Sequence, residues 1–132
     1  MNTLKIIIEK SADFYDAYAE NCEGIYGAGE TAEVAKTNAL EGLKLFIETQ
    51  KNEDLPEILK GEYGIVFKFD TQSFLKYYGE IFSKPALSKL TGINEKLLHQ
   101  YASGAKIPRE ENRKKLEEAM HKLGKELTAL EL

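Results

Sequence analysis

The chain has 132 residues, of which 42% are hydrophobic and 30% are charged, so it can form the core of one domain or of two very small ones. It contains no apolar run near the roughly 20 residues of a membrane-spanning helix and no signal-peptide pattern, which excludes a membrane span and predicts a cytoplasmic protein. Its single cysteine and two histidines exclude an internal disulfide and give no metal-ligand spacing, so no metal or other cofactor is expected.

The net charge of −4 is distributed unevenly along the chain. Residues 1–70 contain 7 lysines and 14 acidic residues, a net charge of −7, whereas residues 71–132 contain 11 basic and 8 acidic residues, a net charge of +3. The excess of positive charge is concentrated in residues 83–115, where eight basic side chains face three acidic ones. Binding to a polyanion is therefore expected in this segment.

The first part of the chain has the pattern of a strand meander. Residues 4–10 are β-branched, residues 14–19 are rich in aromatic side chains, and residues 24–28 follow a cluster typical of turns. Three consecutive strands joined by tight turns are therefore predicted.

An amphipathic helix is predicted after the meander. Thr31 can cap it, and apolar residues then recur every three or four positions up to Ile47, with the helix ending before Asn52. Alternation of apolar and polar residues over 62–69 predicts a fourth strand. The predicted N-terminal domain, residues 1–69, is thus β-β-β-α-β. The helix is predicted to bury Ala32, Ala35, Ala39, Leu40, Leu43, Phe46 and Ile47.

From Asp70, which can cap a helix, the apolar period changes from two to 3.6 and predicts an all-α C-terminal domain over residues 70–132. The fold class is therefore α+β. A second helix can open at Ser83, because Pro85 is tolerated in a first turn. The apolar side of the first helix is predicted to comprise Phe74, Leu75, Tyr78, Ile81 and Phe82. The buried side of the second is predicted to comprise Ala86, Leu87 and Leu90.

A turn containing Gly92 follows, Asn94 can cap a third helix that runs to Ser103, and Gly104 stands where a left-handed residue ends a helix. In the final helix, apolar residues are spaced four, three, four and three apart, as in a heptad seam. The seam can join two copies of the chain or close the core of the helical domain, and both interpretations stay open. The seam residues are Leu116, Met120, Leu123, Leu127 and Leu130.

Two short helices joined by a tight turn, the second polar on one side, form an arrangement that can place a helix in the major groove of DNA. Residues 83–104 resemble the Cro/phage-repressor type of helix-turn-helix at unbroken spacing. The residues that carry the resemblance are Ser83, Ala86, Leu87, Gly92, Ile93, Asn94, Tyr101 and Gly104.

The resemblance implies a set of DNA-binding residues. Lysine is suited to guanine, glutamine to adenine, and glutamate to the amino group of cytosine. An ordinary solvated helix face within a protein–protein module is the alternative interpretation. The groove-facing positions are Asn94, Glu95, Lys96, His99 and Gln100. The flanking positions, which would reach phosphates, are Ser83, Lys84, Lys106 and Arg109.

Residues 21–47 resemble HicB antitoxins, whose N-terminal domain has a partial RNase H-like fold and which often carry a helix-turn-helix module. Val34 stands where a glutamate is common in that family. The resemblance implies an N-terminal domain that binds a HicA-like toxin. The positions that match the family pattern are Gly24, Gly29, Thr31, Ala35, Asn38, Ala39 and Glu41.

The predicted function is that of a type II antitoxin that neutralises a HicA-like mRNA interferase, represses its own operon by binding operator DNA, and forms a homodimer or higher oligomer. The acidic N-terminal domain would complement a basic toxin. One alternative is a stand-alone transcriptional regulator whose N-terminal domain senses another protein or a ligand.

The other alternative is a metal-dependent nuclease. A solvated acidic surface is favoured over it, because the helix supplies no obvious further carboxylate to close a metal site. No catalytic residue is assigned, and the chain is not expected to be an enzyme. The candidate carboxylates are Glu9, Asp13, Asp16 and Glu20.

Overall fold

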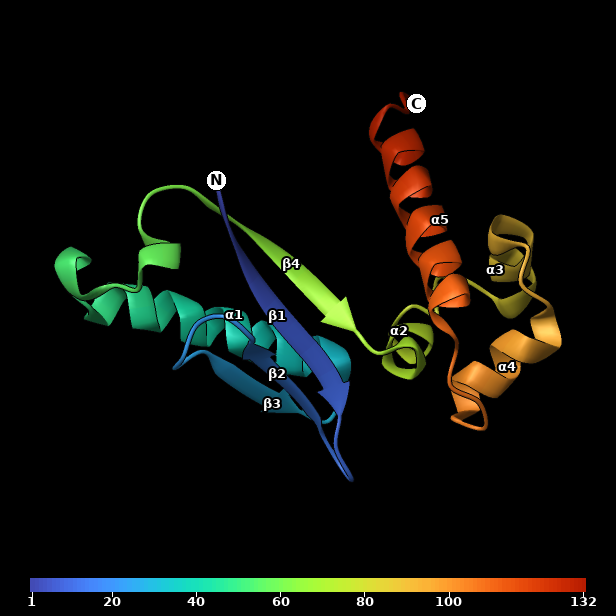
Figure 1. The fold of residues 1–132 in the computed structure, drawn as a ribbon, viewed down its shortest axis with the longest axis horizontal. Helices are drawn as coiled ribbons and strands as arrows, with labels where there is room; N and C mark the ends of the chain where they lie inside the picture. Colours follow the sequence, from blue (N-terminus) through green and yellow to red (C-terminus); the bar gives the residue numbers. More distant parts are fainter. The chain divides into compact units, whose positions relative to one another are not determined.

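The computed structural model describes all 132 residues and divides them into two compact units, Met1–Ser73 and Phe74–Leu132 (Figure 1). The α+β class and the β-β-β-α-β order of the N-terminal region are confirmed. None of the helices has the length and apolar character needed to cross a membrane. The elements of the N-terminal region are β1 (Asn2–Lys10), β2 (Tyr15–Ala19), β3 (Tyr26–Gly29), α1 (Ala32–Thr49), two 3-10 turns (Asn52–Asp54 and Glu57–Leu59) and β4 (Tyr63–Phe69).

The four strands form one mixed sheet in the order β3-β2-β1-β4. The three strands of the meander are antiparallel, whereas β4 runs parallel to β1, with Leu4 opposite Ile65 and Ile8 opposite Phe69. A parallel neighbour needs a crossover connection, and α1 supplies it. Because α1 lies between β3 and β4 in the chain, it returns the chain across one face of the sheet (Figure 1).

The core of the N-terminal unit lies between the sheet and α1. Alternate residues of β1, namely Leu4, Ile6 and Ile8, are fully buried, and β4 shows the predicted alternation of exposed and half-buried side chains. The predicted cap is confirmed, because the Oγ1 of Thr31 accepts a hydrogen bond from the backbone N of Val34 at 3.1 Å. The buried residues of α1 are Ala32, Ala35, Ala39 and Leu43, all from the predicted stripe.

A glycine on β3 sets how closely α1 approaches the sheet. A Cβ atom placed on Gly27 would lie 2.3 Å from the backbone N of Ala39 and 2.7 Å from the backbone O of Ala35. The helix backbone therefore occupies the space that any other side chain at this position would need. The small residues Ala35 and Ala39 on α1 permit the same close approach from the other side.

The C-terminal region is helical, as predicted, and the Phe74–Leu132 unit has its own core. Asp70 caps the first helix, because its Oδ2 accepts a hydrogen bond from the backbone N of Ser73 at 3.2 Å. The helices are α2 (Thr71–Tyr77), α3 (Lys84–Thr91), α4 (Glu95–Ser103) and α5 (Glu110–Thr128). The buried core consists of Leu75, Leu87, Ile93, Leu98, Tyr101 and Leu116.

Three sequence-based predictions of local structure are wrong. The strand β3 begins at Tyr26 rather than at Gly24, because Gly24 has a φ of +90° and belongs to the preceding turn. The helix α2 ends at Tyr77, so Ile81 lies in the turns that follow it and is 69% exposed. Leu90 is 42% exposed, because the core contacts α3 along a narrow line centred on Leu87, and Leu90 lies about 60° away around the helix.

The seam on α5 is divided between core and surface. Leu116 is buried in the helical core and Met120 packs against it, Leu123 is half-buried, and Leu127 is exposed. Leu130 lies beyond the end of α5 and is also exposed. The first half of the seam therefore closes the core of its own unit, and the second half leaves apolar side chains uncovered.

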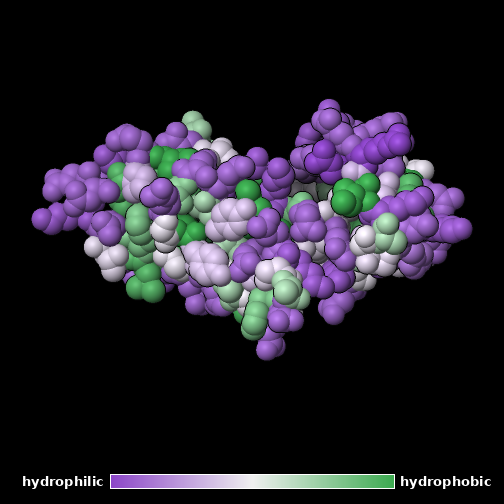
Figure 2. All heavy atoms as spheres, turned by 60° about the horizontal axis from the view of Figure 1, so that its bottom comes forward, coloured by the Kyte–Doolittle hydropathy of each residue, from purple (hydrophilic) through white to green (hydrophobic).

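Most of the surface on the face drawn in Figure 2 is hydrophilic. On the face drawn in Figure 2, hydrophobic residues form several separate patches among hydrophilic ones. The exposed large hydrophobic side chains include Tyr26 and Val66 in the N-terminal unit and Leu127 in the C-terminal unit.

Candidate nucleic-acid interface

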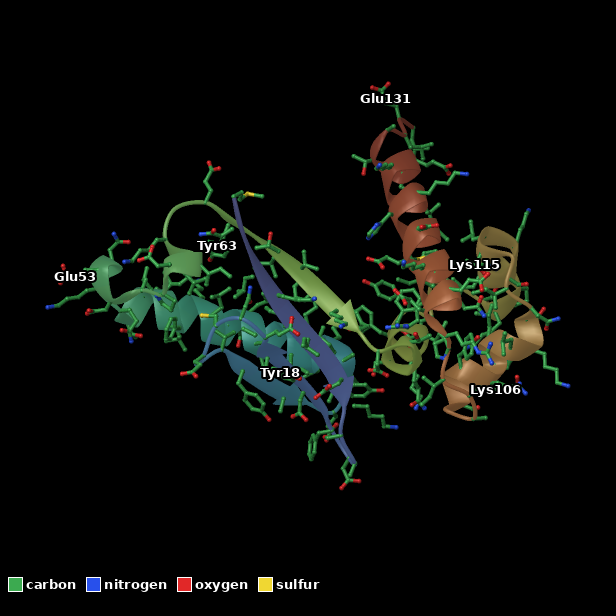
Figure 3. The ribbon with its side chains drawn as sticks, in the orientation of Figure 1. Tyr18, Glu53, Tyr63, Lys106, Lys115 and Glu131 are labelled. Carbon is green, nitrogen blue, oxygen red and sulfur yellow. The ribbon has the colours of Figure 1, made fainter.

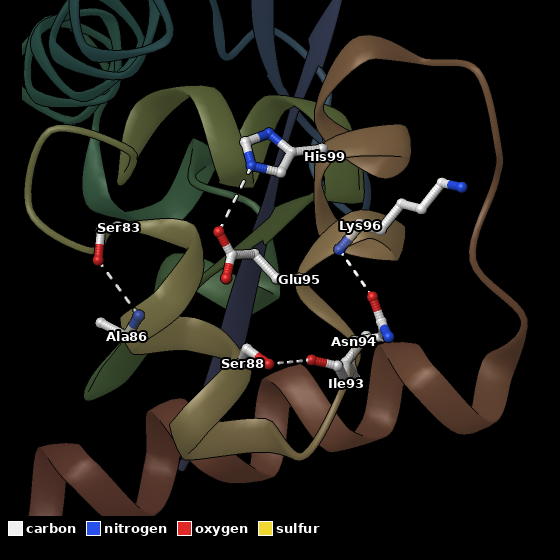
Figure 4. Close-up of polar contacts among 8 residues, drawn as sticks. All are labelled: Ser83, Ala86, Ser88, Ile93, Asn94, Glu95, Lys96 and His99. Atoms are coloured by element: carbon white, nitrogen blue, oxygen red, sulfur yellow. Dashed lines mark hydrogen bonds and ion pairs between the residues drawn. The ribbon is translucent and has the colours of Figure 1, made fainter.

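The turn between α3 and α4 is fixed by several hydrogen bonds (Figure 4). The Oγ of Ser83 caps α3 by accepting a hydrogen bond from the backbone N of Ala86 at 3.2 Å. At the other end, Gly92 has a φ of +78°, and its N–H donates to the carbonyl of Ser88. The Oγ of Ser88 in turn donates to the carbonyl of Ile93 at 2.6 Å. A left-handed residue is needed at this corner, and glycine adopts that conformation without steric cost.

The helix α4 has one buried and one exposed side. Leu98 and Tyr101 face the core, and the hydroxyl of Tyr101 accepts a hydrogen bond from the Nδ2 of Asn112 on α5 at 2.8 Å. The helix ends at Gly104, which has a φ of +83°. The packing of the buried side therefore fixes the direction in which the exposed side points.

The residues predicted to bind DNA come mainly from the exposed surface of α3, α4 and the segment that follows α4. Lys84 and Gln100 are half-buried. Glu95 and His99 point toward each other from successive turns of α4, and the side chain of Lys96 extends from another side of the helix (Figure 4). Lys106 lies in the segment after α4 (Figure 3). The exposed members of the predicted set are Ser83, Asn94, Glu95, Lys96, His99, Lys106 and Arg109.

Asn94 has a structural role that limits which atoms of its side chain can contact DNA. Its Oδ1 accepts a hydrogen bond from the backbone N of Lys96 at 2.8 Å and so caps α4. Pairing with adenine needs both the oxygen and the nitrogen of an amide side chain. The capping bond holds the oxygen of Asn94 toward the backbone of α4, and Glu95 is the first residue of the helix itself.

The positive charges near α4 differ in how far they are neutralised. Lys114 and Lys115 on α5 form ion pairs with Glu110 and Glu111, at 3.5 and 3.8 Å. Lys106 and Arg109 are exposed and form no ion pair, which leaves them available to phosphate groups. The predicted set omitted two further exposed cations without an ion pair, Lys89 and Arg113, although the charge excess over residues 83–115 was a signal for both.

The carboxylates considered for a nuclease site lie on or beside β1 and β2. Glu9 and Asp16 are opposite each other in the sheet, and Asp16 accepts a hydrogen bond from the hydroxyl of Tyr26 at 2.8 Å. Glu20 forms an ion pair with Lys5 at 3.5 Å. No group of three or more potential ligand side chains is arranged to hold a metal ion. Asp16 and Glu20 therefore bind neighbouring side chains of the sheet.

Two of these carboxylates, Glu9 and Asp16, help to raise the pKa of the neighbouring tyrosines Tyr18 and Tyr26. The hydrogen bond to Asp16 raises the pKa of Tyr26, with partial burial as a further cause. Partial burial raises the pKa of Tyr18, and the negative charge of Glu9 adds to this effect. Both phenols therefore stay protonated near neutral pH and can donate hydrogen bonds.

The arrangement of α3, the turn and α4 can hold a short helix against a groove while basic side chains beside it contact phosphates. No protein-family model, no curated protein and no solved structure matches this chain. Within the structure, the candidate interface is described by its geometry and its charge.

Proposed function

We propose that this protein is a DNA-binding repressor that also serves as the antitoxin of a type II toxin–antitoxin system. One observation carries the DNA-binding part. The α3–turn–α4 unit, closed by Gly92 and anchored by Leu98, presents the start of α4 on the surface, and exposed cations without an ion pair, such as Lys106, follow the end of that helix. The likeness of residues 83–104 to the Cro/phage-repressor helix-turn-helix supports the same assignment.

Two substitutions test the DNA-binding part. Gln100→Ala is expected to relax base preference at one position of the binding site by about 1–3 kcal/mol. Lys106→Ala removes a phosphate contact, so it should weaken binding to all sequences and reduce the salt dependence by about one counterion. Gel-shift titrations on DNA from upstream of the gene, at several salt concentrations, measure both effects.

Lys125→Ala is the matched control, because Lys125 lies about 22 Å along α5 from the first residue of that helix. It should leave affinity and salt dependence unchanged. Equal affinity of the wild-type chain and both site variants for upstream DNA would contradict the assignment of α4 as the recognition helix.

The antitoxin part of the proposal is supported by the character of the N-terminal unit. It has 7 lysines against 14 acidic residues, which complements a basic partner. The sheet face opposite α1 carries a row of paired residues that crosses all four strands: Tyr26, Tyr18, Ile7 and Lys68. Tyr18 lies on β2 (Figure 3), and Tyr26 on the edge strand is 59% exposed. The likeness of residues 21–47 to HicB antitoxins, with their partial RNase H-like domain, points to a HicA-like toxin.

Tyr26→Ala is expected to weaken binding of the toxin by about 2 kcal/mol, because exposed tyrosines are frequent energetic centres of interfaces. The measurement is a pull-down and titration of the co-expressed product of the adjacent gene. Tyr26→Phe separates the ring from the hydroxyl that donates to Asp16. Leu45→Ala, on the exposed side of α1, is the control and should bind normally.

The product of the neighbouring gene distinguishes an antitoxin from a stand-alone transcriptional regulator. A short basic protein encoded there that binds the wild-type chain supports an antitoxin. If no such protein is encoded or bound, the stand-alone regulator is the better description of the chain.

The proposal includes a homodimer. A repressor of this kind places two recognition helices about one turn of DNA apart, so it needs two copies of the chain. The uncovered half of the α5 seam, with Leu123 and Leu127, offers apolar area for the contact. Sedimentation equilibrium of the full chain measures the oligomeric state.

A further inference from the structure

Glu95 and His99 form a pair on the exposed side of α4. The Nε2 of His99 lies 3.9 Å from the Oε1 of Glu95, and their side chains are 62% and 50% exposed. Neither residue forms another ion pair. Both α3 and α5 pack against α4, the latter through Asn112 and Leu116. None of their charged side chains forms an ion pair with Glu95 or His99. These side chains are Lys84 and Lys89 on α3, and Glu110, Glu111, Arg113, Lys114 and Lys115 in the first part of α5. Glu95 is therefore the acidic side chain nearest to His99 among the ion pairs of the structure.

A carboxylate on a helix that faces DNA is repelled by the phosphates unless something offsets its charge. One offset is a hydrogen bond from a base amino group. Cytosine presents its amino group to the major groove without an acceptor on the same base, whereas adenine places the acceptor N7 beside its amino group. The other offset is a cation next to the carboxylate, and histidine is the side chain whose charge changes near neutral pH.

We propose that Glu95 and His99 read DNA as one proton-linked unit, an inference that rests on the DNA-binding function proposed above. Glu95 accepts a hydrogen bond from the amino group of a cytosine in the binding site. His99 is a positioning residue, which holds the carboxylate of Glu95 and takes up a proton from solvent when DNA binds. Protonated His99 cancels the charge of Glu95, and the phosphates stabilise the imidazolium. The preferred ligand is thus duplex DNA with a C·G pair facing the first turn of α4, bound more tightly at lower pH.

The test uses the full-length chain and a random duplex library, from which the preferred sequence is selected and then titrated by fluorescence anisotropy at pH 6 and pH 8. Wild-type affinity is expected to be about tenfold higher at pH 6, since the uptake of one proton changes affinity by at most tenfold per pH unit. Glu95→Gln is expected to change the preferred base from cytosine to adenine, which pairs with a glutamine amide.

Two substitutions of His99 separate its effect on the position of the Glu95 carboxylate from the effect of its own charge. His99→Ala should lose both the pH dependence and most of the cytosine preference. His99→Gln retains a hydrogen-bond donor without the charge, so it should restore the cytosine preference and leave the affinity independent of pH. The chain has only two histidines, and the other, His121, lies on α5, so His121→Ala is the matched control and should behave like wild type.

Each possible result either supports or contradicts the proton-linked pair of Glu95 and His99. Equal wild-type affinity at both pH values, or pH dependence that persists in His99→Ala, overturns the proton-linked pair. If the wild-type chain selects a DNA sequence but Glu95→Gln keeps its base preference, the inference fails while the DNA-binding function stands. If the wild-type chain selects no sequence at either pH, both fail.

Discussion

Replacing Gly27 by alanine is expected to lower the free energy of unfolding of the N-terminal unit by about 3 kcal/mol, the upper part of the range for overpacked sites. The added Cβ would meet the backbone of α1 at Ala39 and Ala35, at 2.3 and 2.7 Å. A backbone cannot change rotamer to make room, so either α1 or β3 must move and lose contacts with the sheet. Urea unfolding gives the free energy. Hydrogen exchange read by mass spectrometry shows which elements loosen, and faster exchange is expected in β3 and α1.

Gly124→Ala is the matched control for this substitution. Gly124 lies inside α5, and a Cβ added there meets no atom within 4 Å. Alanine is the better helix former, so this variant should gain about 0.5–1 kcal/mol. Equal stability of the Gly27→Ala and Gly124→Ala variants would show that α1 does not lie as close to β3 as the distances indicate.

Leu98→Ala is expected to destabilise the C-terminal unit by about 3 kcal/mol and to abolish DNA binding at temperatures where the wild-type chain binds. Leu98 is fully buried at the centre of a small helical core. Small domains have only a few kcal/mol of net stability, so the loss of one large core side chain unfolds a substantial fraction of the molecules. Thermal unfolding by circular dichroism, together with anisotropy titration of DNA, measures both effects.

Leu90→Ala is the matched control, because it removes a leucine that lies outside the same core. Because Leu90 is exposed on α3, its removal should change stability by less than about 0.5 kcal/mol and leave DNA binding intact. A loss as large as that of Leu98→Ala would show that the buried side of α3 extends to Leu90, as periodicity alone suggested.

The features that the sequence predicted well depend on residues close together in the chain. The caps at Thr31, Asp70 and Asn94 need only a side-chain oxygen and a backbone N–H two or three residues later. Gly92 and Gly104 end helices through their own backbone conformation. Local chemistry of this kind leaves a clear signal in a short stretch of sequence, so the elements and their order could be predicted.

The predictions that failed depend on contacts between distant residues. Periodicity placed Leu90 and Ile81 in the core, but the number of side chains that a core accepts depends on the neighbouring helices. The parallel pairing of β1 with β4 joins residues about 60 positions apart and follows from the crossover through α1. In the candidate interface, the sequence correctly predicted that Asn94 caps α4. It did not show that the capping bond turns the side-chain oxygen of Asn94 toward the helix backbone, although reading adenine would need that oxygen.

The side chains that orient α4 are separate from those that it presents to its surroundings. Leu98 and Tyr101 pack the buried side of α4 against the helical core, and the hydrogen bond from Asn112 to the hydroxyl of Tyr101 connects α4 to α5. Glu95, Lys96 and His99 make no contribution to that core. Consequently, under the DNA-binding function proposed above, a new DNA target could evolve or be engineered by replacing the outward-facing residues, because the core residues that set the orientation of α4 would stay the same.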